Sequence, residues 1–279
     1  MKRTILVLVL VFAAIVPLTA QKLTAEEIIA KHLDAVGTST ARDFNKNISI
    51  VGEVLFEIRP SKLFSSNGKA VFANEGNKIL MAMSFPVVNY QLEKIVFDGH
   101  SPNIAYTNEG TRSELGQFLH TNDGIIREGL IGGVLSKSWL LATASDRKAR
   151  VTAEGSKKID GRDTWVLSIE PKKPIGLKVK VYIDKETFHH VRTEYFRTLS
   201  ALIGAKPELS SQQSESYENL IEDFSDFKLE NGLSLPRGYK VSLYLQRSNL
   251  LKEVYYTFKF KDFYYNQKLD PATFATGSN

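Results

Sequence analysis

The chain has 279 residues, no cysteine, 43% hydrophobic residues and a formal net charge of +5. Without cysteine it forms neither disulfides nor a thiolate nucleophile, so a protein of this length must be held together by a buried hydrophobic core. The positive charge is compatible with contact to anionic membrane surfaces, but it is too small and too dispersed to indicate a nucleic-acid partner.

Residues 1–20 have the layout of a secretory signal peptide. Two basic residues precede an apolar run from Ile5 to Val16, and small residues follow up to Ala20. The run is shorter than the about 20 residues of a membrane-spanning helix, and no cysteine follows that would carry a lipid. We therefore predict cleavage before Gln21 and a periplasmic, non-lipidated protein in which residues 21–279 form a single domain.

The first elements of the mature chain are a helix and a long strand. Thr24 and Glu27 form a capping box, and apolar residues recur at helical spacing up to Gly37, which predicts a helix between these positions. From Asn47 to Arg59 apolar and polar residues alternate, as in a strand with one apolar face.

Alternation with a period of two returns in later segments, which lie around residues 177–183, 239–246 and 254–261. Asp160-Gly161 and Asn231-Gly232 are dipeptides typical of two-residue hairpin loops. The sequence therefore predicts antiparallel neighbours, and it lacks the strand and helix alternation of a parallel sheet.

Helical material is predicted between the early and the late strands. Thr111 and Glu114 form a second capping box, and the most apolar internal segment, Asp123 to Ala142, follows. We predict that this segment covers the apolar face of the sheet, with its glycines allowing close approach of the backbone. Its second apolar contact is either the protein's own core or a bound hydrophobic ligand. Leu199 to Ser216 is predicted to be a mobile loop.

Residue patterns for catalysis or metal binding are weak. The five histidines have no ligand spacing, and we expect them at the surface or half-buried. The acidic residues Glu222, Asp223 and Asp226 are expected at a solvated strand edge rather than in a catalytic carboxylate pair. The aromatic and basic residues of 252–268 fit a final strand better than a platform for single-stranded nucleic acid. We therefore predict no catalytic residue, no metal, no cofactor and no nucleic-acid partner.

Four local patterns in order along the chain resemble the periplasmic lipoprotein-carrier superfamily of the LolA and LolB type. They are TAEEIIAKHLDAVG (24–37), KVYIDKETFHHVRTEY (180–195), DFSDFKLENGLSLPRGYKV (223–241) and LDPATF (269–274). The resemblance implies a mainly β (α+β) fold, in which a strongly curved antiparallel sheet forms an incomplete barrel and a few helices act as a lid. It also implies that acyl chains of lipoproteins, or related amphiphiles, lie in the hollow between sheet and lid.

On this reading the apolar residues of the inward strand faces and of the lid line a ligand site: Ile48, Ile50, Val54, Phe56, Leu130, Ile131, Val134, Trp139, Val179, Val181, Val241, Leu243 and Phe258. The leading hypothesis is a monomeric, non-enzymatic carrier or sensor of a lipid or an acylated lipoprotein, with envelope membrane proteins as further partners. Two alternatives stay open. One is a protein-interaction module with a packed core, and the other is an enzyme on a similar sheet.

Overall fold

The computed structural model describes residues 23–59, 64–199, 215–247 and 250–275. The strands are β1 (Asn47–Arg59), β2 (Phe64–Glu75), β3 (Lys78–Ser84), β4 (Leu92–Phe97), β5 (Pro102–Ile104), β6 (Arg150–Ile159), β7 (Arg162–Glu170), β8 (Lys178–Asp184), β9 (His190–Leu199), β10 (Ser216–Glu230), β11 (Leu233–Arg247) and β12 (Leu250–Tyr265). The helices are α1 (Ala25–Val36), α2 (Ser39–Phe44), α3 (Glu114–Thr121), α4 (Gly124–Arg127) and α5 (Leu140–Arg147), with the 3-10 helices η1 (Gly133–Leu135) and η2 (Pro271–Phe274). The predicted signal peptide and most of the predicted mobile loop lie outside the described residues.

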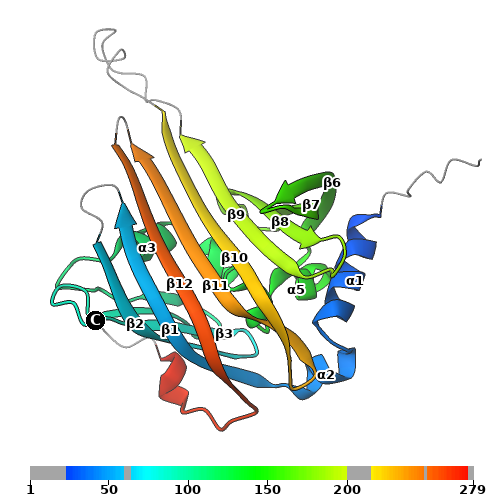
Figure 1. Ribbon diagram of the computed structural model, residues 1–279, viewed down its shortest axis with the longest axis horizontal. Helices are drawn as coiled ribbons and strands as arrows, with labels where there is room; N and C mark the ends of the chain where they lie inside the picture. Colours follow the sequence, from blue (N-terminus) through cyan, green and yellow to red (C-terminus); the bar gives the residue numbers. More distant parts are fainter. Residues whose placement is uncertain (1–22, 60–63, 200–214, 248–249, 276–279) are drawn as a thin grey trace, which may run out of the picture.

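Twelve strands form one antiparallel sheet, and the strand order places the apolar segment 123–142 on the connection between its two edge strands. The order is β5-β4-β3-β2-β1-β12-β11-β10-β9-β8-β7-β6, so the chain starts in the middle, runs to one edge and returns from the other. The edge strands β5 and β6 are consecutive in sequence, and α3, α4, η1 and α5 lie on the connection between them. Figure 1 shows α3 and α5 behind the long strands β9 to β12 and β1. The predicted mainly β fold with an antiparallel sheet that is not closed into a barrel is confirmed.

Local sequence signals produced the predicted strands and hairpins. β1 follows its predicted bounds, and alternate residues such as Ile48, Ile50 and Val54 are buried. Both residues of the Asp160-Gly161 and Asn231-Gly232 turns have positive φ, as two-residue hairpin loops require. The predicted helix also forms as α1, with the Thr24 and Glu27 capping box in place.

The predicted start of the second helix was wrong. α3 begins at Glu114, and its N-cap is Ser113, whose side chain accepts a hydrogen bond from the backbone N–H of Gly116. Thr111 instead forms an isolated bridge with Asn108 in the preceding turn. Two hydroxyl residues stand near the helix start, and the turn at Asn108 to Thr111 leaves only the second one beside the first helical N–H groups.

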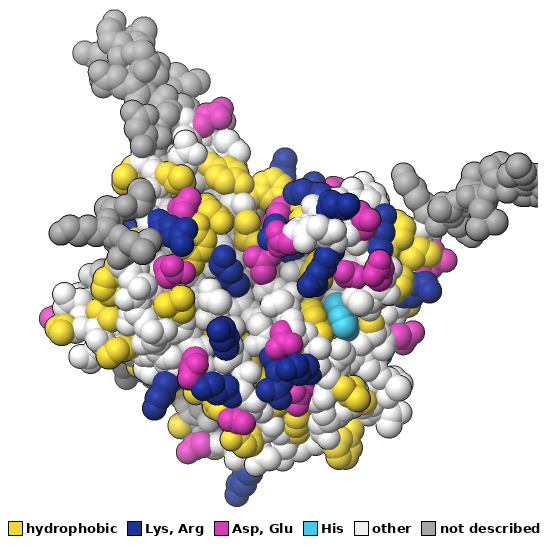
Figure 2. Space-filling model, viewed as in Figure 1, with side chains coloured by type: hydrophobic (Ala, Val, Ile, Leu, Met, Phe, Trp, Pro, Cys, Tyr) yellow, Lys and Arg dark blue, Asp and Glu magenta, His cyan; other side chains and the backbone are white. Residues whose placement is uncertain are grey.

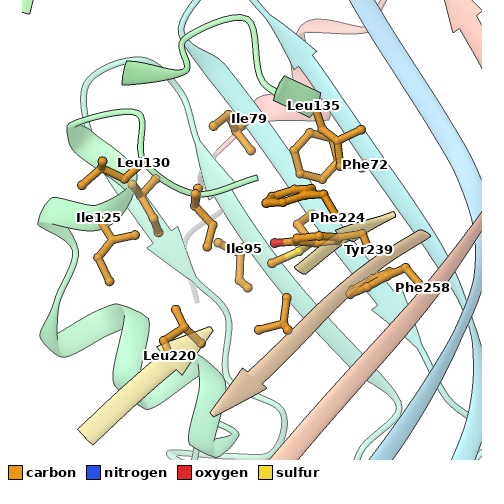
Figure 3. Packing of buried hydrophobic residues seen from close by; sticks show 14 of the residues in the cluster. Phe72, Ile79, Ile95, Ile125, Leu130, Leu135, Leu220, Phe224, Tyr239 and Phe258 are labelled. Atoms are coloured by element: carbon orange, nitrogen blue, oxygen red, sulfur yellow. The ribbon is translucent and has the colours of Figure 1, made fainter. Parts of the chain in front are cut away.

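The hydrophobic core lies between the inward face of the sheet and the connection that crosses it. Figure 3 shows Leu130 and Leu135 of the connection with Phe72, Phe224 and Tyr239 of the sheet. Side chains from β1 to β4, β7 to β12 and the helices join in one cluster of buried residues. Burial on this scale, rather than covalent linkage, holds the cysteine-free chain together.

Candidate functional site

Residues 123–142, called the lid segment below, follow a path that only glycine permits at several positions. Gly132 has φ 78°, and a Cβ atom there would lie 2.8 Å from the ring of Phe72. Gly133 has φ 48°, and its Cβ would lie 2.6 Å from the imidazole of His190. Left-handed backbone disfavours larger residues, and contact distances this short leave no room for a Cβ atom. The glycines therefore let the lid segment lie directly on aromatic side chains of the sheet.

Hydrogen bonds from the sheet hold the backbone of the lid segment. The N–H of Gly132 donates to Oε1 of Glu222 at 2.7 Å. The hydroxyl of Tyr195 lies 2.8 Å from the carbonyl oxygen of Leu130, and Nδ2 of Asn74 donates to the carbonyl of Leu135 at 2.6 Å. β2, β9 and β10 thus supply partners for peptide groups that would otherwise be buried and unsatisfied.

Glu222 is the centre of this network and was misplaced by sequence reasoning, which expected it at a solvated edge. It is fully buried on the inward face of β10, on the same side of the strand as Leu220 and Phe224. Its acidic neighbours do reach the outer side: Asp223 pairs with Arg192, and Asp226 is exposed. The same alternation that marked apolar inward positions therefore pointed to Glu222 as well.

The geometry around Glu222 favours its protonated form. The hydroxyl of Tyr195 lies 2.5 Å from Oε2 of Glu222 as well as near Leu130, and a phenol has one proton to donate. Both contacts are hydrogen bonds when Glu222 is protonated and donates to Tyr195, which then donates to Leu130. Tyr239 also donates to Oε1 of Glu222. Burial raises the pKa of Glu222 to about 7, against the lowering effect of its hydrogen bonds.

Aromatic contacts fix the end of the lid segment. Trp139 stacks on the imidazole of His190 with 4.5 Å between ring centroids, and its edge meets His32 at 4.8 Å. His32 and His190 are fully buried, so the expectation of surface or half-buried histidines was wrong for these two. Burial lowers the pKa of His32 to about 4, and Nδ1 of this ring lies 2.7 Å from the carbonyl of Phe188. Both imidazoles therefore act as neutral aromatic surfaces for Trp139 at neutral pH.

An apolar cavity of about 290 Å³ lies beside this end of the lid segment, between it, the two N-terminal helices and the strands β1 and β11. Its lining residues are Leu33, Val36, Arg42, Asp43, Ile48, Val134, Ser136, Lys137, Trp139, Ala142, Thr143, Leu233 and Leu235. The apolar members come from α1, β1, β11 and the lid segment, and the charged members come from α2 and Lys137. The cavity therefore has an apolar wall and charged groups at one side.

The thirteen predicted lining residues are brought together, but most of them do not face open space. Ile48, Val134 and Trp139 line the cavity. The others lie in the same hydrophobic cluster as tightly buried side chains: Ile50, Val54, Phe56, Leu130, Ile131, Val179, Val181, Val241, Leu243 and Phe258. The second apolar contact of the lid segment in this structure is thus the protein's own core.

A second buried carboxylate was also missed. Glu93 on β4 is fully buried, and the hydroxyl of Tyr90 donates to its Oε2 at 2.8 Å. Tyr90 also lies 2.7 Å from the hydroxyl of Tyr256. Glu93 precedes the inward residue Ile95 by two positions, so its place on the inward face carries the same period-two signal as Glu222.

The outer face of the sheet offers a hollow of a different kind. A groove of about 660 Å³ is lined by residues of β9 to β12 and of the turn after β6, among them many charged side chains. Arg192 pairs there with Asp223 at 2.6 Å and with Asp160 at 3.3 Å. Figure 2 shows basic and acidic side chains mixed on this face. Such a paired, mixed surface is not suited to an apolar ligand.

Within the ranges that the structure describes, no three His, Cys, Asp or Glu side chains are grouped so that they would hold a metal ion. None of the described helices is long and apolar enough to cross a membrane.

Comparisons with known proteins find related architecture but no close relative. No protein-family model and no curated sequence matches the chain. A LolA superfamily protein from Nitrosomonas europaea aligns at 10% identity with a TM-score of 0.46, covering 91% of this chain and 98% of that one. A putative outer-membrane lipoprotein-sorting protein domain from Vibrio parahaemolyticus aligns at 10% identity and a TM-score of 0.45, covering 88% and 95%. A DUF1329 family protein from Desulfovibrio piger aligns at 12% identity and a TM-score of 0.47, covering 89% and 95%.

The comparison therefore finds the LolA-like proteins that the sequence motifs resembled. At such low identity the likeness is one of fold alone. The geometry of the lid segment and its cavity must carry any statement about function.

Proposed function

We propose that this protein is an exported, non-enzymatic binding protein that holds an acyl chain of a lipid or an acylated lipoprotein between its sheet and the lid segment. The observation that carries this proposal is the apolar cavity bordered by Ile48, Val134 and Trp139. It opens beside a hydrophobic cluster that contains all the other residues predicted to line the site. Binding would serve transport or sensing of such molecules in the cell envelope.

The size of the cavity indicates that the lid segment moves on binding. Its volume of about 290 Å³ is just below the roughly 300 to 1,000 Å³ that is typical of ligand pockets. A short apolar group fits as the structure stands, whereas a full acyl chain must displace Val134 and its neighbours. Each methylene buried contributes ~0.8 kcal/mol, so a longer chain can offset the contacts that opening removes.

Mass spectrometry of an organic extract tests the proposal. The chain is expressed from Met1, exported, purified without detergent and extracted, and we expect a stoichiometric phospholipid, fatty acid or acylated peptide. Uptake of an added fluorescent lipid is measured in parallel. An empty extract together with no uptake would contradict the proposal.

A pair of substitutions locates the binding region. Val134→Asp places a charge in the cavity wall and is expected to abolish lipid uptake, because a carboxylate is costly to desolvate beside an acyl chain. Val88→Asp is the matched control, since Val88 is 84% exposed. Circular dichroism checks that both variants keep the sheet. Unchanged uptake in a folded Val134→Asp variant would place the ligand elsewhere.

One observation favours the second candidate function, a protein-interaction module. Most predicted lining residues are already packed against one another, as in a core that needs no ligand. Among the described residues, β6 is an edge strand that pairs with β7 alone, and its other edge forms no ladder with a described strand, as strand addition requires. A protein that co-purifies with the empty chain, and is lost when proline replaces Thr152 on β6, would favour this candidate.

A further inference from the structure

The charged side of the cavity is predominantly basic. Arg42 and Lys137 line it, and Asp43 is the only acidic lining residue. Lys46 follows two residues beyond the end of α2, close enough to affect the titration of Lys137. Two cations and one carboxylate therefore line the cavity at this side, and a third cation lies near enough to act on Lys137.

Arg42 and Lys137 have backbone partners but no paired carboxylate among the described residues. Nη1 of Arg42 donates to the carbonyl of Leu33 at 2.6 Å and to that of Gly37, at the C-terminal end of α1. Nζ of Lys137 donates to the carbonyl of Arg42. Among the residues described, no carboxylate lies within 4.0 Å of the charged nitrogens of Arg42, Lys46 or Lys137. Neutral carbonyls orient the cations without cancelling their charge.

The environment of Lys137 compensates its positive charge only in part. Burial is the largest effect and lowers the pKa of this ammonium group below its ordinary value. Asp43 raises the pKa, whereas Lys46 and Arg42 lower it further. A cation that is partly desolvated and repelled by its neighbours gains more from an anion than a fully hydrated one does.

We propose that the ligand of this cavity is an anionic amphiphile, whose single carboxylate or phosphate group binds between Arg42 and Lys137 while its apolar part passes Val134 and Trp139. The inference rests on the proposed function and names the class of its ligand. A neutral lipid would leave the positive charges on the charged side of the cavity without an anionic partner. Carboxylate and phosphate share the chemistry that these cations recognise, and they are distinguished by the test below.

The test compares amphiphiles that differ only in the headgroup. Binding of dodecanoate, dodecyl phosphate and dodecanol, each below its aggregation concentration, is measured by calorimetry with the full mature chain. We expect either anion to bind at least about tenfold more tightly than the alcohol, because hydrogen bonds to charged groups are stronger than neutral ones. The tighter of the two anions identifies the source as a fatty acid or a phosphorylated lipid.

Substitutions then test whether the preference for anionic amphiphiles comes from the charged side of the cavity. Lys137→Met keeps most of the apolar stem and removes the charge, so the anions should lose their advantage over dodecanol. Lys137→Arg should retain the advantage. Lys173→Met is the matched control on the surface, because Lys173 is exposed and lines no part of this cavity.

The outcomes separate this inference from the proposed function. Equal affinity of the wild-type protein for dodecanoate, dodecyl phosphate and dodecanol would overturn the anionic headgroup and leave acyl binding intact. An anion preference that survives in Lys137→Met, with an unchanged fold, would also overturn it. Failure of all three amphiphiles to bind would contradict the proposed function itself.

Discussion

Two parts of the lid segment are held to the sheet in different ways. The carbonyl groups of Leu130 and Leu135 accept hydrogen bonds from buried side chains, and the N–H of Gly132 donates one to Glu222. The side chains of Val134 and Trp139 border a cavity on one side. The lid segment is therefore fixed at its polar centre and still leaves apolar space at its margin. We expect a ligand to enter at that margin and the hydrogen-bonded centre to resist displacement.

The largest expected effect comes from removing the hydrogen-bonded centre. Glu222→Ala leaves Tyr239 and the N–H of Gly132 without a partner and creates a void in the core. We expect a loss of about 3 to 5 kcal/mol in the free energy of unfolding, because unsatisfied polar groups and cavities both destabilise. Urea unfolding measures this loss. Lys228→Ala, at an exposed position on the same strand, should change stability by less than about 0.5 kcal/mol.

The pH dependence of stability tests the protonation of the same centre. The pKa of Glu222 is raised to about 7 in the folded protein, from an ordinary value of 4.5. Between these values the folded chain holds a proton that the unfolded chain has released. This proton contributes up to about 3 kcal/mol to the free energy of unfolding. The contribution is complete below pH 4.5 and is lost as the pH rises to about 7.

Glu222→Gln isolates that contribution. The amide imitates the protonated acid, so the variant should keep the hydrogen bonds and lose this part of the pH dependence. His32 acts in the opposite direction, because its lowered pKa makes stability rise from about pH 4 to 6.5. The difference between wild type and variant, from urea unfolding at pH 5 and pH 8, therefore reports Glu222 alone. An identical pH profile for both proteins would show that Glu222 is ionised throughout.

The last prediction compares two neighbouring residues, of which Val134 should show the smallest loss of stability. Leu135 is fully buried below the hydrogen-bonded centre, whereas Val134 is 9% exposed at the cavity. Leu135→Ala should cost about 2 to 5 kcal/mol, and Val134→Ala about 1 kcal/mol, since a side chain that already borders empty space loses fewer contacts. Thermal and urea unfolding of both variants measure the difference. Equal losses would mean that the cavity margin is as tightly packed as the centre.

Part of the candidate site was predictable because strand alternation is local. Alternation placed Ile48 on an inward strand face, whereas the resemblance to LolA-like proteins placed Val134 in the lid; both line the cavity. The same period of two also placed Glu222 inward, but acidic residues are so often solvated that its chemistry outweighed its position. The charged side of the cavity was not predicted, because Arg42 and Lys137 are 95 residues apart in sequence and no sequence pattern joins them.

The sequence by itself determined the local structure of this protein: the capped helix from Thr24, the alternating strands and the Asn231-Gly232 type of hairpin. These depend on contacts within a few residues. Only the tertiary structure decided that the connection between the two edge strands crosses the sheet and buries Glu222, His32 and His190. Whether an inward position meets water, a ligand or protein depends on which distant segment covers it, and that choice is made by packing of the whole chain.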